Sequence, residues 1–334
     1  MSKINFRSIE DLKLCIKENL HKIPSEITLI VGVPRSGMIP ASIISTYLNK
    51  ELADIDTFIS GRAFSSGERS SIINSNKYVL IVDDSISSGS QISKIRNKIE
   101  SKNIVSNVRY LCVYATEESI HLIDYYFEEV PHKRIFEWNL MSSWFLKETC
   151  CDIDGVLCMD PTDIQNDDGN NYIDFLKNVK PLYGISSHGE KLTTGWLVTS
   201  RLEKYREATE KWLSENNIEY EKLIMVNLQD KVERDNLKVF NHAHFKAQVY
   251  RKSPYRFFIE SAMWQAKIIA KMSGKPVFCM ENGKIYYSTA TRSHFVKVNQ
   301  VLNKYFRDRS FSSGMLLFIK RLIKEIIYRS KRSF

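Results

Sequence analysis

The chain repeats one arrangement: a short apolar segment, polar or acidic residues where that segment ends, and then an amphipathic segment. In the first part of the chain, the pattern predicts helices at 8–21, 38–49 and 90–102 and strands at 27–33, 53–59, 78–83 and 108–115. Such an alternation predicts a parallel sheet that is covered by helices on both faces. Ligands of these sheets bind at the carboxyl ends of the strands, so the residues after each strand are the candidates for function.

A second unit of the same kind begins at Cys150. It predicts helices at 172–178, 201–216 and 261–273 and strands at 150–153, 195–199, 222–226, 256–260 and 276–279. A length of 334 residues is suited to two domains, because a domain usually has about 100–200 residues. We therefore expect an α/β protein with two doubly wound parallel-sheet domains, at 1–145 and 146–300, and a tail at 301–334.

The composition indicates a folded protein of the cytoplasm. Hydrophobic residues make up 43% of the chain and charged residues 26%, which disfavours disorder. The first residues lack the apolar stretch and cleavage site of a signal peptide, and no apolar run reaches the roughly 18–20 residues of a spanning helix. The six cysteines form no CxxC pair, which disfavours zinc sites and disulfides.

The net charge of +9 is concentrated at the end of the chain. Residues 304–334 carry nine Lys and Arg against Asp308 and Glu325, and the rest of the chain is nearly neutral. A nucleic-acid-binding domain spreads its positive charge over a folded face, so we expect no nucleic-acid partner. Residues 314–329 have the spacing of a basic amphipathic helix, which favours binding to an anionic membrane surface; the alternative is a helix that packs on the second domain.

The first candidate site lies in the segment "VDDSISSGSQ" at 82–91. A strand ends there in Asp83 and Asp84, and a loop of small residues leads into the helix expected at 90–102. Backbone N–H groups at the start of a helix bind phosphate, and the two carboxylates can accept hydrogen bonds from sugar hydroxyls. The alternative is an ordinary turn between a strand and a helix.

This segment resembles the signature of type I phosphoribosyltransferases. The resemblance implies that the loop binds the 5-phosphate of phosphoribosyl pyrophosphate and that Asp83 and Asp84 bind its ribose. The loop residues concerned are Ser85, Ser87, Ser88, Gly89 and Ser90. Gln91 departs from the family, which usually has Thr or Ser at this position.

Two upstream segments also resemble this family, in the expected order. "VGVPRSGMIPA" at 31–41 resembles the pyrophosphate loop, with Arg35, Ser36 and Gly37 between a strand and a helix, and 59–70 corresponds to the mobile lid. The implied reaction displaces magnesium-bound pyrophosphate from C1 of the ribose through an oxocarbenium-like transition state. Inversion at C1 gives a β-linked ribose 5-phosphate.

The second candidate site lies in "CCDIDGVLC" at 150–158. Its carboxylates, Asp152 and Asp154, stand two apart at the end of a strand and can both face one metal ion. A DxD pair alone also occurs in nucleotide-sugar glycosyltransferases. With its flanking residues, the segment resembles motif I of haloacid dehalogenase-like phosphatases, which implies that Asp152 is the nucleophile and Asp154 the general acid and base.

The other motifs of that phosphatase family follow in order. Thr199 in "GWLVTSR" resembles the residue that binds the transferred phosphoryl group, and Lys246 in "HFKAQVY" the lysine that neutralises charge, with Lys252 and Lys267 as alternatives. Glu260 in "RFFIESA" resembles the acidic residue that holds Mg²⁺, although Ser261 stands where a second acidic residue is usual. The resemblance implies Mg²⁺ held by Asp152, the Asp154 carbonyl, Glu260 and waters.

Two further features bear on the second site. His242 and His244 alternate like residues of a strand, but without nearby Cys or Asp we expect them to be surface or core residues rather than a metal pair. The insertion at about 159–193 indicates a small cap or none, which leaves the site open to a phosphate on a bulky molecule.

The combination of both sets of motifs over about residues 25–290 resembles the bifunctional ribofuranosyltransferases of bacterial surface-polysaccharide assembly. It implies transfer of 5-phosphoribose to a sugar hydroxyl of a lipid-linked glycan, followed by removal of the 5-phosphate. With the basic tail, it predicts a protein on the inner face of the cytoplasmic membrane. Two alternatives stay open: a base phosphoribosyltransferase fused to a nucleotidase, and a sensor that binds a phosphoribosyl ligand without catalysis.

Overall fold

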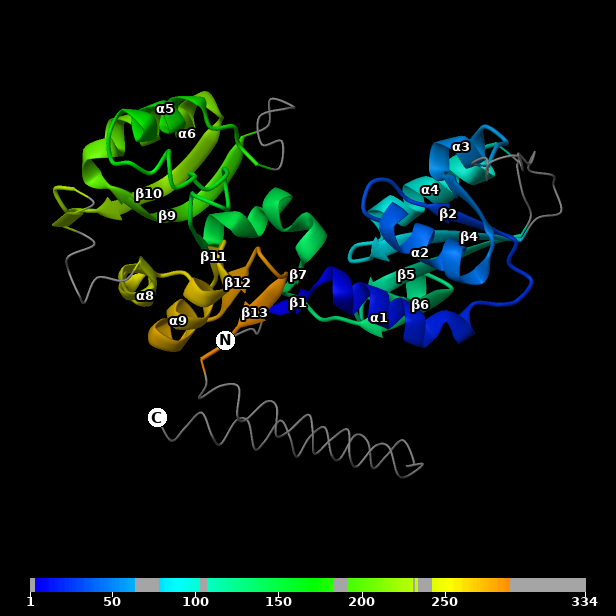
Figure 1. Cartoon of the computed structure of the whole chain (residues 1–334). Helices are drawn as coiled ribbons and strands as arrows, with labels where there is room; N and C mark the ends of the chain where they lie inside the picture. The colour runs from blue at the N-terminus through cyan, green and yellow to red at the C-terminus, as the bar shows by residue number, and fades with distance from the viewer. Residues whose placement is uncertain are drawn as a thin grey trace, which may run out of the picture.

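The computed structural model describes residues 4–63, 78–102, 107–182, 191–230, 232–233 and 242–288. Two parallel β-sheets, each with helices on both faces, form two lobes (Figure 1). The prediction of an α/β fold with parallel sheets is confirmed.

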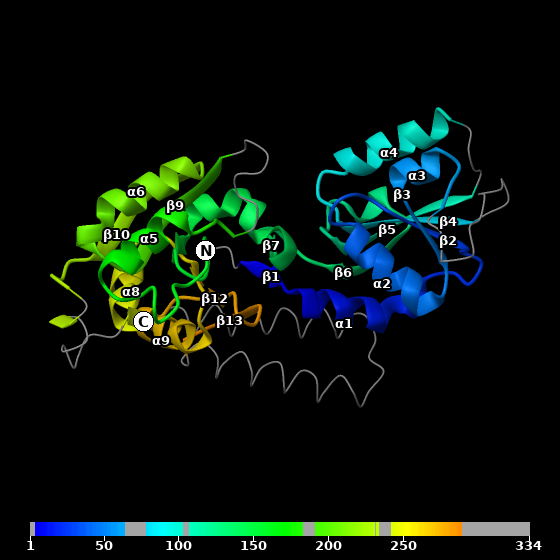
Figure 2. The same cartoon turned by 45° about the horizontal axis from the view of Figure 1, so that its top comes forward.

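The first sheet has five parallel strands in the order β3-β2-β4-β5-β6. The strands are β2 (Leu29–Gly32), β3 (Glu51–Asp54), β4 (Val79–Ser85), β5 (Val108–Ala115) and β6 (Tyr125–Glu129). Helices α1 (Ile9–Asn19) and α2 (Met38–Leu48) cover one face, and α3 (Ile55–Ile59) and α4 (Ser90–Glu100) cover the other (Figure 2).

Strand β4 is apolar from Val79 to Val82 because both faces of the first sheet are covered. Leu80 and Val82 pack with α1 and α2, whereas Val79 and Ile81 pack with α3 and α4. Side chains alternate between the two faces of a strand, so a run of apolar residues is what a strand between two helical layers requires.

The second sheet has the order β10-β9-β8-β11-β12-β13, and only β13 is antiparallel to its neighbour. The strands are β8 (Cys150–Cys151), β9 (Leu192–Leu202), β10 (Ile218–Val226), β11 (Phe258–Glu260), β12 (Val277–Cys279) and β13 (Lys284–Tyr286). Its helices are α5 (Asn170–Asn178), α6 (Arg206–Glu215), α8 (His242–Lys252) and α9 (Met263–Ser273).

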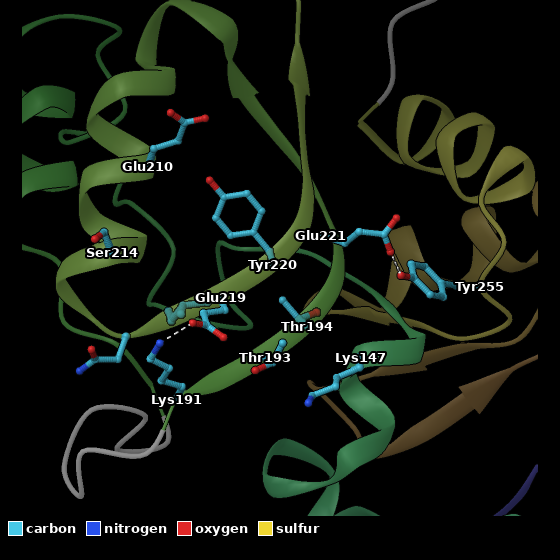
Figure 3. Close-up of a pocket in the computed structure, with 12 residues that line it drawn as sticks. Lys147, Lys191, Thr193, Thr194, Glu210, Ser214, Glu219, Tyr220, Glu221 and Tyr255 are labelled. Atoms are coloured by element: carbon cyan, nitrogen blue, oxygen red, sulfur yellow. Dashed lines mark hydrogen bonds and ion pairs between the residues drawn. The ribbon is translucent and has the colours of Figure 1, made fainter.

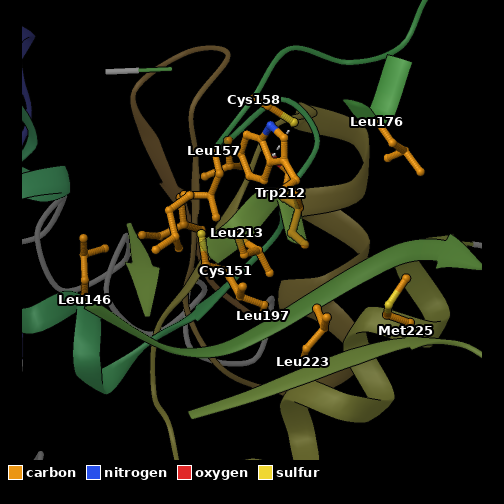
Figure 4. Packing of buried hydrophobic residues seen from close by; sticks show 14 of the residues in the cluster. Leu146, Cys151, Leu157, Cys158, Leu176, Leu197, Trp212, Leu213, Leu223 and Met225 are labelled. Carbon is orange, nitrogen blue, oxygen red and sulfur yellow. Dashed lines mark hydrogen bonds between the residues drawn. The ribbon is translucent and has the colours of Figure 1, made fainter. Parts of the chain in front are cut away.

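The second sheet also separates two apolar layers. Trp212 and Leu213 of α6 pack with Leu176 of α5 and with Cys151 and Leu197 of the sheet (Figure 4). Helices α8 and α9 pack on the opposite face, against the neighbouring residues along the strands. All six cysteines are buried and free.

Two short strands join the lobes. Strand β1 (Asn5–Arg7) pairs in parallel with β7 (Arg134–Phe136), and we call this pair the β1–β7 ribbon. Short 3-10 helices lie at η1 (Leu20–Lys22), η2 (Ile120–Leu122), η3 (Glu137–Ser142), η4 (Trp144–Glu148) and η5 (Glu203–Tyr205). The ribbon was not predicted, because three-residue strands leave no periodic pattern in the sequence.

Three sequence-based predictions were wrong in detail. The strand expected at 53–59 ends at Asp54, whose side chain accepts a hydrogen bond from the Thr57 N–H (2.6 Å) and so begins α3. The helix expected at 201–216 begins at Arg206, because β9 continues to Leu202 and η5 follows. His242 and His244 lie in helix α8, not in a strand.

Some predictions fall on residues outside the described ranges. The basic helix at 314–329, most of the lid at 59–70 and part of the insertion at 159–193 belong to these. Within the described part of the chain, no helix is long and apolar enough to cross a membrane.

Gly195 on β9 leaves no room for a side chain. A Cβ there would lie 2.4 Å from the Thr149 carbonyl oxygen, which accepts the Trp196 N–H at the junction of β8 and β9. We expect Gly195→Ala to lower the free energy of unfolding by about 2–3 kcal/mol. The control Gly274→Ala has open space but a left-handed φ of +74°, and we expect it to cost about 1 kcal/mol. Thermal unfolding of both variants compares them, and an equal loss would contradict the steric explanation.

Two candidate active sites

Each sheet reverses its strand order at one place. In the first sheet, the chain passes from β2 to β3 on one side and then to β4 on the other side of β2. In the second sheet, it passes from β8 to β9 and β10 and then returns to β11 on the other side of β8. Loops diverge from such a place at the carboxyl ends of the strands, and the resulting crevice is the usual binding site of the fold.

Two buried carboxylates end β4 in the first crevice. The Asp84 carboxylate accepts hydrogen bonds from Ser36 Oγ (3.0 Å) and from Trp138 Nε1 (2.7 Å). Asp83 and Asp84 are 8% and 4% exposed, so they lie inside the crevice rather than on an open surface. Ser36, in the loop after β2, and Asp84 were predicted separately, and the structure brings them together.

Gly37 is required where the loop after β2 crosses the end of β4. A Cβ at this position would lie 2.6 Å from the Val33 carbonyl oxygen and 2.7 Å from Asp83 Oδ1. The backbone therefore runs directly against the carboxylate, and a side chain at position 37 would push the two apart. Arg35, two residues earlier, is exposed.

The loop after β4 places hydrogen-bond donors at the start of α4. Ser87, Ser88 and Ser90 are exposed, and Gly89 precedes the helix with φ +73°, which favours glycine. Ser88 Oγ accepts the Ser90 N–H (3.4 Å), but the N-cap residue Gly89 provides no side-chain cap, so the following N–H groups of the first turn can bind an anion. Ser85 is half-buried, at the end of β4.

The charge of the first site calls for a ligand that donates hydrogen bonds or carries a cation. Burial disfavours the ionised form of Asp83, and repulsion from Asp84 adds to this, so the pKa of Asp83 is raised. Hydroxyl groups or a bound cation would compensate the two carboxylates.

In the second crevice, the Lys246 ammonium joins the ends of two strands. Lys246 Nζ donates to Asp152 Oδ2 (2.5 Å), Glu260 Oε2 (2.9 Å) and Gln265 Oε1 (3.0 Å). All three charged groups are at most 4% exposed. Lys252 and Lys267, the alternatives to Lys246, are exposed, so Lys246 is the candidate that reaches the site.

The cluster contains more negative than positive charge. Burial disfavours the Lys246 ammonium, but attraction to Asp152 and Glu260 outweighs it and raises the pKa of Lys246. Burial also disfavours the ionised form of Asp152, and repulsion from Glu260 and Asp154 adds to this. Together, these effects outweigh the attraction of Lys246, so the pKa of Asp152 is raised. One further cation would balance this charge.

Asp154 faces away from Lys246 and toward Arg201. The buried guanidinium of Arg201 binds both carboxylate oxygens of Asp154, with Nη2 2.6 Å from Oδ1 and Nε 3.0 Å from Oδ2. Such a two-point contact fixes the orientation of a carboxylate. Thr199, two residues before Arg201, is buried, and its Oγ accepts the Arg201 N–H (3.2 Å).

The oxygen atoms of the second site suit Mg²⁺. Among the described residues, no three His, Cys, Asp or Glu side chains are grouped so that they could hold a metal ion by themselves. The carboxylates of Asp152 and Glu260, with a backbone carbonyl and water, are the kind of donor set that Mg²⁺ uses, since it binds few carboxylates.

Sequence reasoning missed four residues of these sites. Arg201 contacts Asp154, and Gln265 contacts Lys246. Asp160 lies close to Gly155, because a Cβ added to Gly155 would be 2.7 Å from Asp160 Oδ2. Arg201 follows Thr199 by two along β9, so a strand period of two could have indicated it. Trp138 could not have been found, because 54 positions separate it from Asp84.

Two grooves lie on the second lobe. One of about 500 Å³ is lined by Asp160 and by residues of the insertion and α5, including Thr162, Asn171, Asp174 and Phe175. The larger, of about 710 Å³, lies at the amino ends of β9 and β10, where Lys191 pairs with Glu219 (Figure 3). It contains none of the predicted site residues. It lies at the amino ends of the strands, whereas ligands in this type of fold bind at the carboxyl ends.

Lys246 should stabilise the second lobe in a pH-dependent way. Lys246→Met leaves the buried Asp152 and Glu260 carboxylates without their ammonium, which should cost about 3–5 kcal/mol at pH 8. A carboxyl with a raised folded pKa loses stability as pH rises, so the loss should be smaller at pH 5. Thermal unfolding at both pH values measures this, with exposed Lys252→Met as the control. An equal loss at pH 5 and pH 8 would contradict the charge explanation.

Comparison with known proteins identifies the first lobe. Residues 7–143 match the family of the phosphoribosyl transferase domain. Similar solved structures include a purine phosphoribosyltransferase from Pyrococcus horikoshii (21% identity, 40% of this chain, 93% of that chain, TM-score 0.32) and a xanthine-guanine-hypoxanthine phosphoribosyltransferase from Helicobacter pylori (16%, 42%, 95%, 0.33). No curated protein matches the chain. The family match covers both loops of the first crevice, and residues 7–143 therefore form a phosphoribosyl transferase domain.

Proposed function

We propose that the chain transfers 5-phosphoribose from phosphoribosyl pyrophosphate to a sugar hydroxyl of a lipid-linked glycan and then removes the 5-phosphate. We assign the first step to the phosphoribosyl transferase domain, whose bounds we propose to be 1–145. The second belongs to a haloacid dehalogenase-like phosphatase domain at 146–300. The observation that carries the second step is the buried contact of Lys246 with both Asp152 and Glu260.

In the transfer step, the residues of the first crevice hold the donor at both ends of its ribose. Asp83 and Asp84 accept hydrogen bonds from the ribose hydroxyls, and the N–H groups at the start of α4 bind the 5-phosphate. The loop of Arg35, Ser36 and Gly37 binds the pyrophosphate that leaves. Mg²⁺, when bound with the pyrophosphate, neutralises the charge that develops on it.

In the hydrolysis step, Asp152 attacks the phosphorus atom, the bond from phosphorus to the 5-oxygen of the ribose breaks, and the 5-oxygen leaves with a proton as a hydroxyl group. Water then hydrolyses the acyl phosphate on Asp152, which releases inorganic phosphate and regenerates the carboxylate. Asp152 Oδ1 accepts the N–H of Ile153 (2.8 Å) and Oδ2 the Lys246 ammonium, so the carboxylate is fixed at both oxygens. Lys246 also lowers the repulsion between this carboxylate and the incoming phosphate. Thr199 would bind the transferred phosphoryl group, and Asp154, oriented by Arg201, would move the protons.

Mg²⁺ in this second site would be held by Asp152, Glu260 and the Asp154 carbonyl. It would supply a positive charge next to the phosphate. This charge would neutralise the carboxylate charge that Lys246 alone does not balance. The surrounding residues orient the nucleophile and position Asp154.

The rest of the chain supports a large acceptor rather than a free base. The groove next to Asp160 has polar side chains suited to sugar hydroxyls. The basic segment at 301–334 would bring the protein to the anionic inner face of the cytoplasmic membrane, where a lipid-linked glycan is found.

Asp152→Asn should separate the two reactions. An amide is a poor nucleophile, so we expect hydrolysis to fall by about 10³-fold or more, with transfer unchanged. In a mixture of protein, Mg²⁺, phosphoribosyl pyrophosphate and lipid-linked or synthetic glycans, mass spectrometry should detect a pentose gain with wild type and a phosphopentose gain with Asp152→Asn.

The exposed Asp163→Asn provides the control for this experiment and should behave like wild type. Free bases belong in the same mixture. If only a base gains mass, the acceptor is a base of nucleotide salvage and not a glycan. If Asp152→Asn still gives an unphosphorylated product, Asp152 is not the nucleophile.

Changing Asp83 and Asp84 together to Ala should have the opposite effect. Transfer should be lost because the ribose hydroxyls lose their acceptors, whereas hydrolysis of a supplied ribosyl 5-phosphate should continue. Phosphate release and pentose transfer are measured on the same preparation, with the exposed Asp56→Ala as the control. If the folded double variant loses both activities, the two steps do not belong to separate sites.

A further inference from the structure

The segment 134–138, which consists of β7 and the two residues after it, has two faces, and each face contacts a different lobe. Phe136 belongs to the core of the first lobe, and its neighbour Ile135 belongs to the core of the second lobe. Arg134 and Phe136 contact the first lobe, as expected for residues two apart on a strand, and Trp138 at the start of η3 contacts it as well. One short segment is therefore packed into both lobes.

The face toward the first lobe reaches the donor site directly. Trp138 Nε1 donates to Asp84 Oδ2 (2.7 Å), and Asp84 is one of the two carboxylates that bind the ribose in our proposal. The indole stacks on Phe136, with ring centroids 5.0 Å apart and an interplanar angle of 17°, and Phe136 stacks on buried Tyr114. This stack fixes the indole, and the indole fixes one oxygen of Asp84.

Arg134 acts on the other part of the donor site. Its guanidinium donates to the carbonyl oxygen of Ile86, at the start of the phosphate-binding loop, and lies over the ring of Phe136 at 5.6 Å. The ribose carboxylate and the phosphate loop are thus both held by residues from the same segment.

The other face of this segment is anchored in the second lobe. Ile135 pairs with Phe6 of β1, and the Phe6 ring lies 5.2 Å from that of Phe278 on β12. Glu137, next to Trp138, accepts the Ile9 N–H (2.8 Å) and lies against Gly283, where an added Cβ would be 2.5 Å from Glu137 Oε1. The turn between β12 and β13 therefore sets the position of the residues that hold Asp84.

We propose that Trp138 and Arg134 are positioning residues of the donor site, and that the second lobe keeps them in place through the β1–β7 ribbon. Donor binding by the transferase domain then depends on the packing of Phe6 on Phe278, a contact between two residues that lie outside the transferase motifs. The inference rests on phosphoribosyl pyrophosphate as the donor, but not on the reaction of the second domain.

The first test measures the binding of phosphoribosyl pyrophosphate with Mg²⁺ by isothermal titration calorimetry on the full chain. Trp138→Phe keeps a ring for the stack but removes the N–H, and we expect about tenfold weaker binding, with donor KM raised and kcat little changed. In an Asp84→Asn background the same change should have little further effect, because Trp138 acts through Asp84.

A second arm tests the link to the second lobe. Phe6→Ala, which removes the ring that packs on Phe278, should weaken donor binding several-fold, whereas Phe6→Leu, which keeps an apolar side chain, should bind nearly as wild type. Circular dichroism and thermal unfolding show which variants are folded. Trp138→Tyr replaces Trp138→Phe if the latter does not fold.

The outcomes distinguish this inference from the proposed function. Absence of binding by wild type would overturn the donor, and the inference with it. Wild-type affinity in folded Trp138→Phe, or an equal loss with and without Asp84→Asn, would overturn the positioning role alone. Wild-type affinity in folded Phe6→Ala would show that the second lobe has no part in donor binding.

Discussion

Each sheet has one central strand that is buried on both faces and ends in carboxylates, and the remaining features of both sites depend on this. Strands β4 and β8 lie where the strand order reverses, so their carboxyl ends open into the crevice between diverging loops. Apolar side chains hold these strands between two layers of helices. The carboxylates at their ends are therefore rigidly placed, but they are also removed from water and need partners.

The two sites meet this need in different ways. Asp84 is held by two neutral donors, Ser36 and Trp138, so no direct ion pair compensates its carboxylate, and a ligand that brings hydroxyl groups and a cation can do so. The second site contains a buried cation, Lys246, between Asp152 and Glu260. A charge already compensated in this way can accept a phosphate, whereas uncompensated carboxylates would repel it. In our proposal, the carboxylates of the first site therefore bind the ribose while its two loops bind the phosphates, and the compensated cluster of the second site receives a phosphate directly.

The sequence predicted what depends on local pattern and missed what depends on distant contacts. The parallel α/β architecture follows from apolar runs alternating with amphipathic helices, and Asp84 and Asp152 follow from acidic residues at strand ends. The polar cap at Asp54 was overlooked, so a helical turn was taken for strand. His242 and His244 show why two alternating residues are too few to define a period. Trp138 and the β1–β7 ribbon depend on contacts over more than 50 positions, which no local pattern encodes.

The order of the proposed reactions follows from how the donor is held. In our proposal the 5-phosphate is bound by N–H groups at the start of α4, so its removal before transfer would release the donor. After transfer, the acceptor would carry that phosphate, and the second site of our proposal would remove it without affecting donor recognition. Because the β1–β7 ribbon packs into both lobes, we infer that a change in the second lobe reaches Asp84 from Phe6 through its strand partner Ile135 on β7 and then through Phe136 and Trp138. The two lobes are thus joined by the same residues that shape the donor site, which gives a physical reason for keeping the two proposed reactions in one chain.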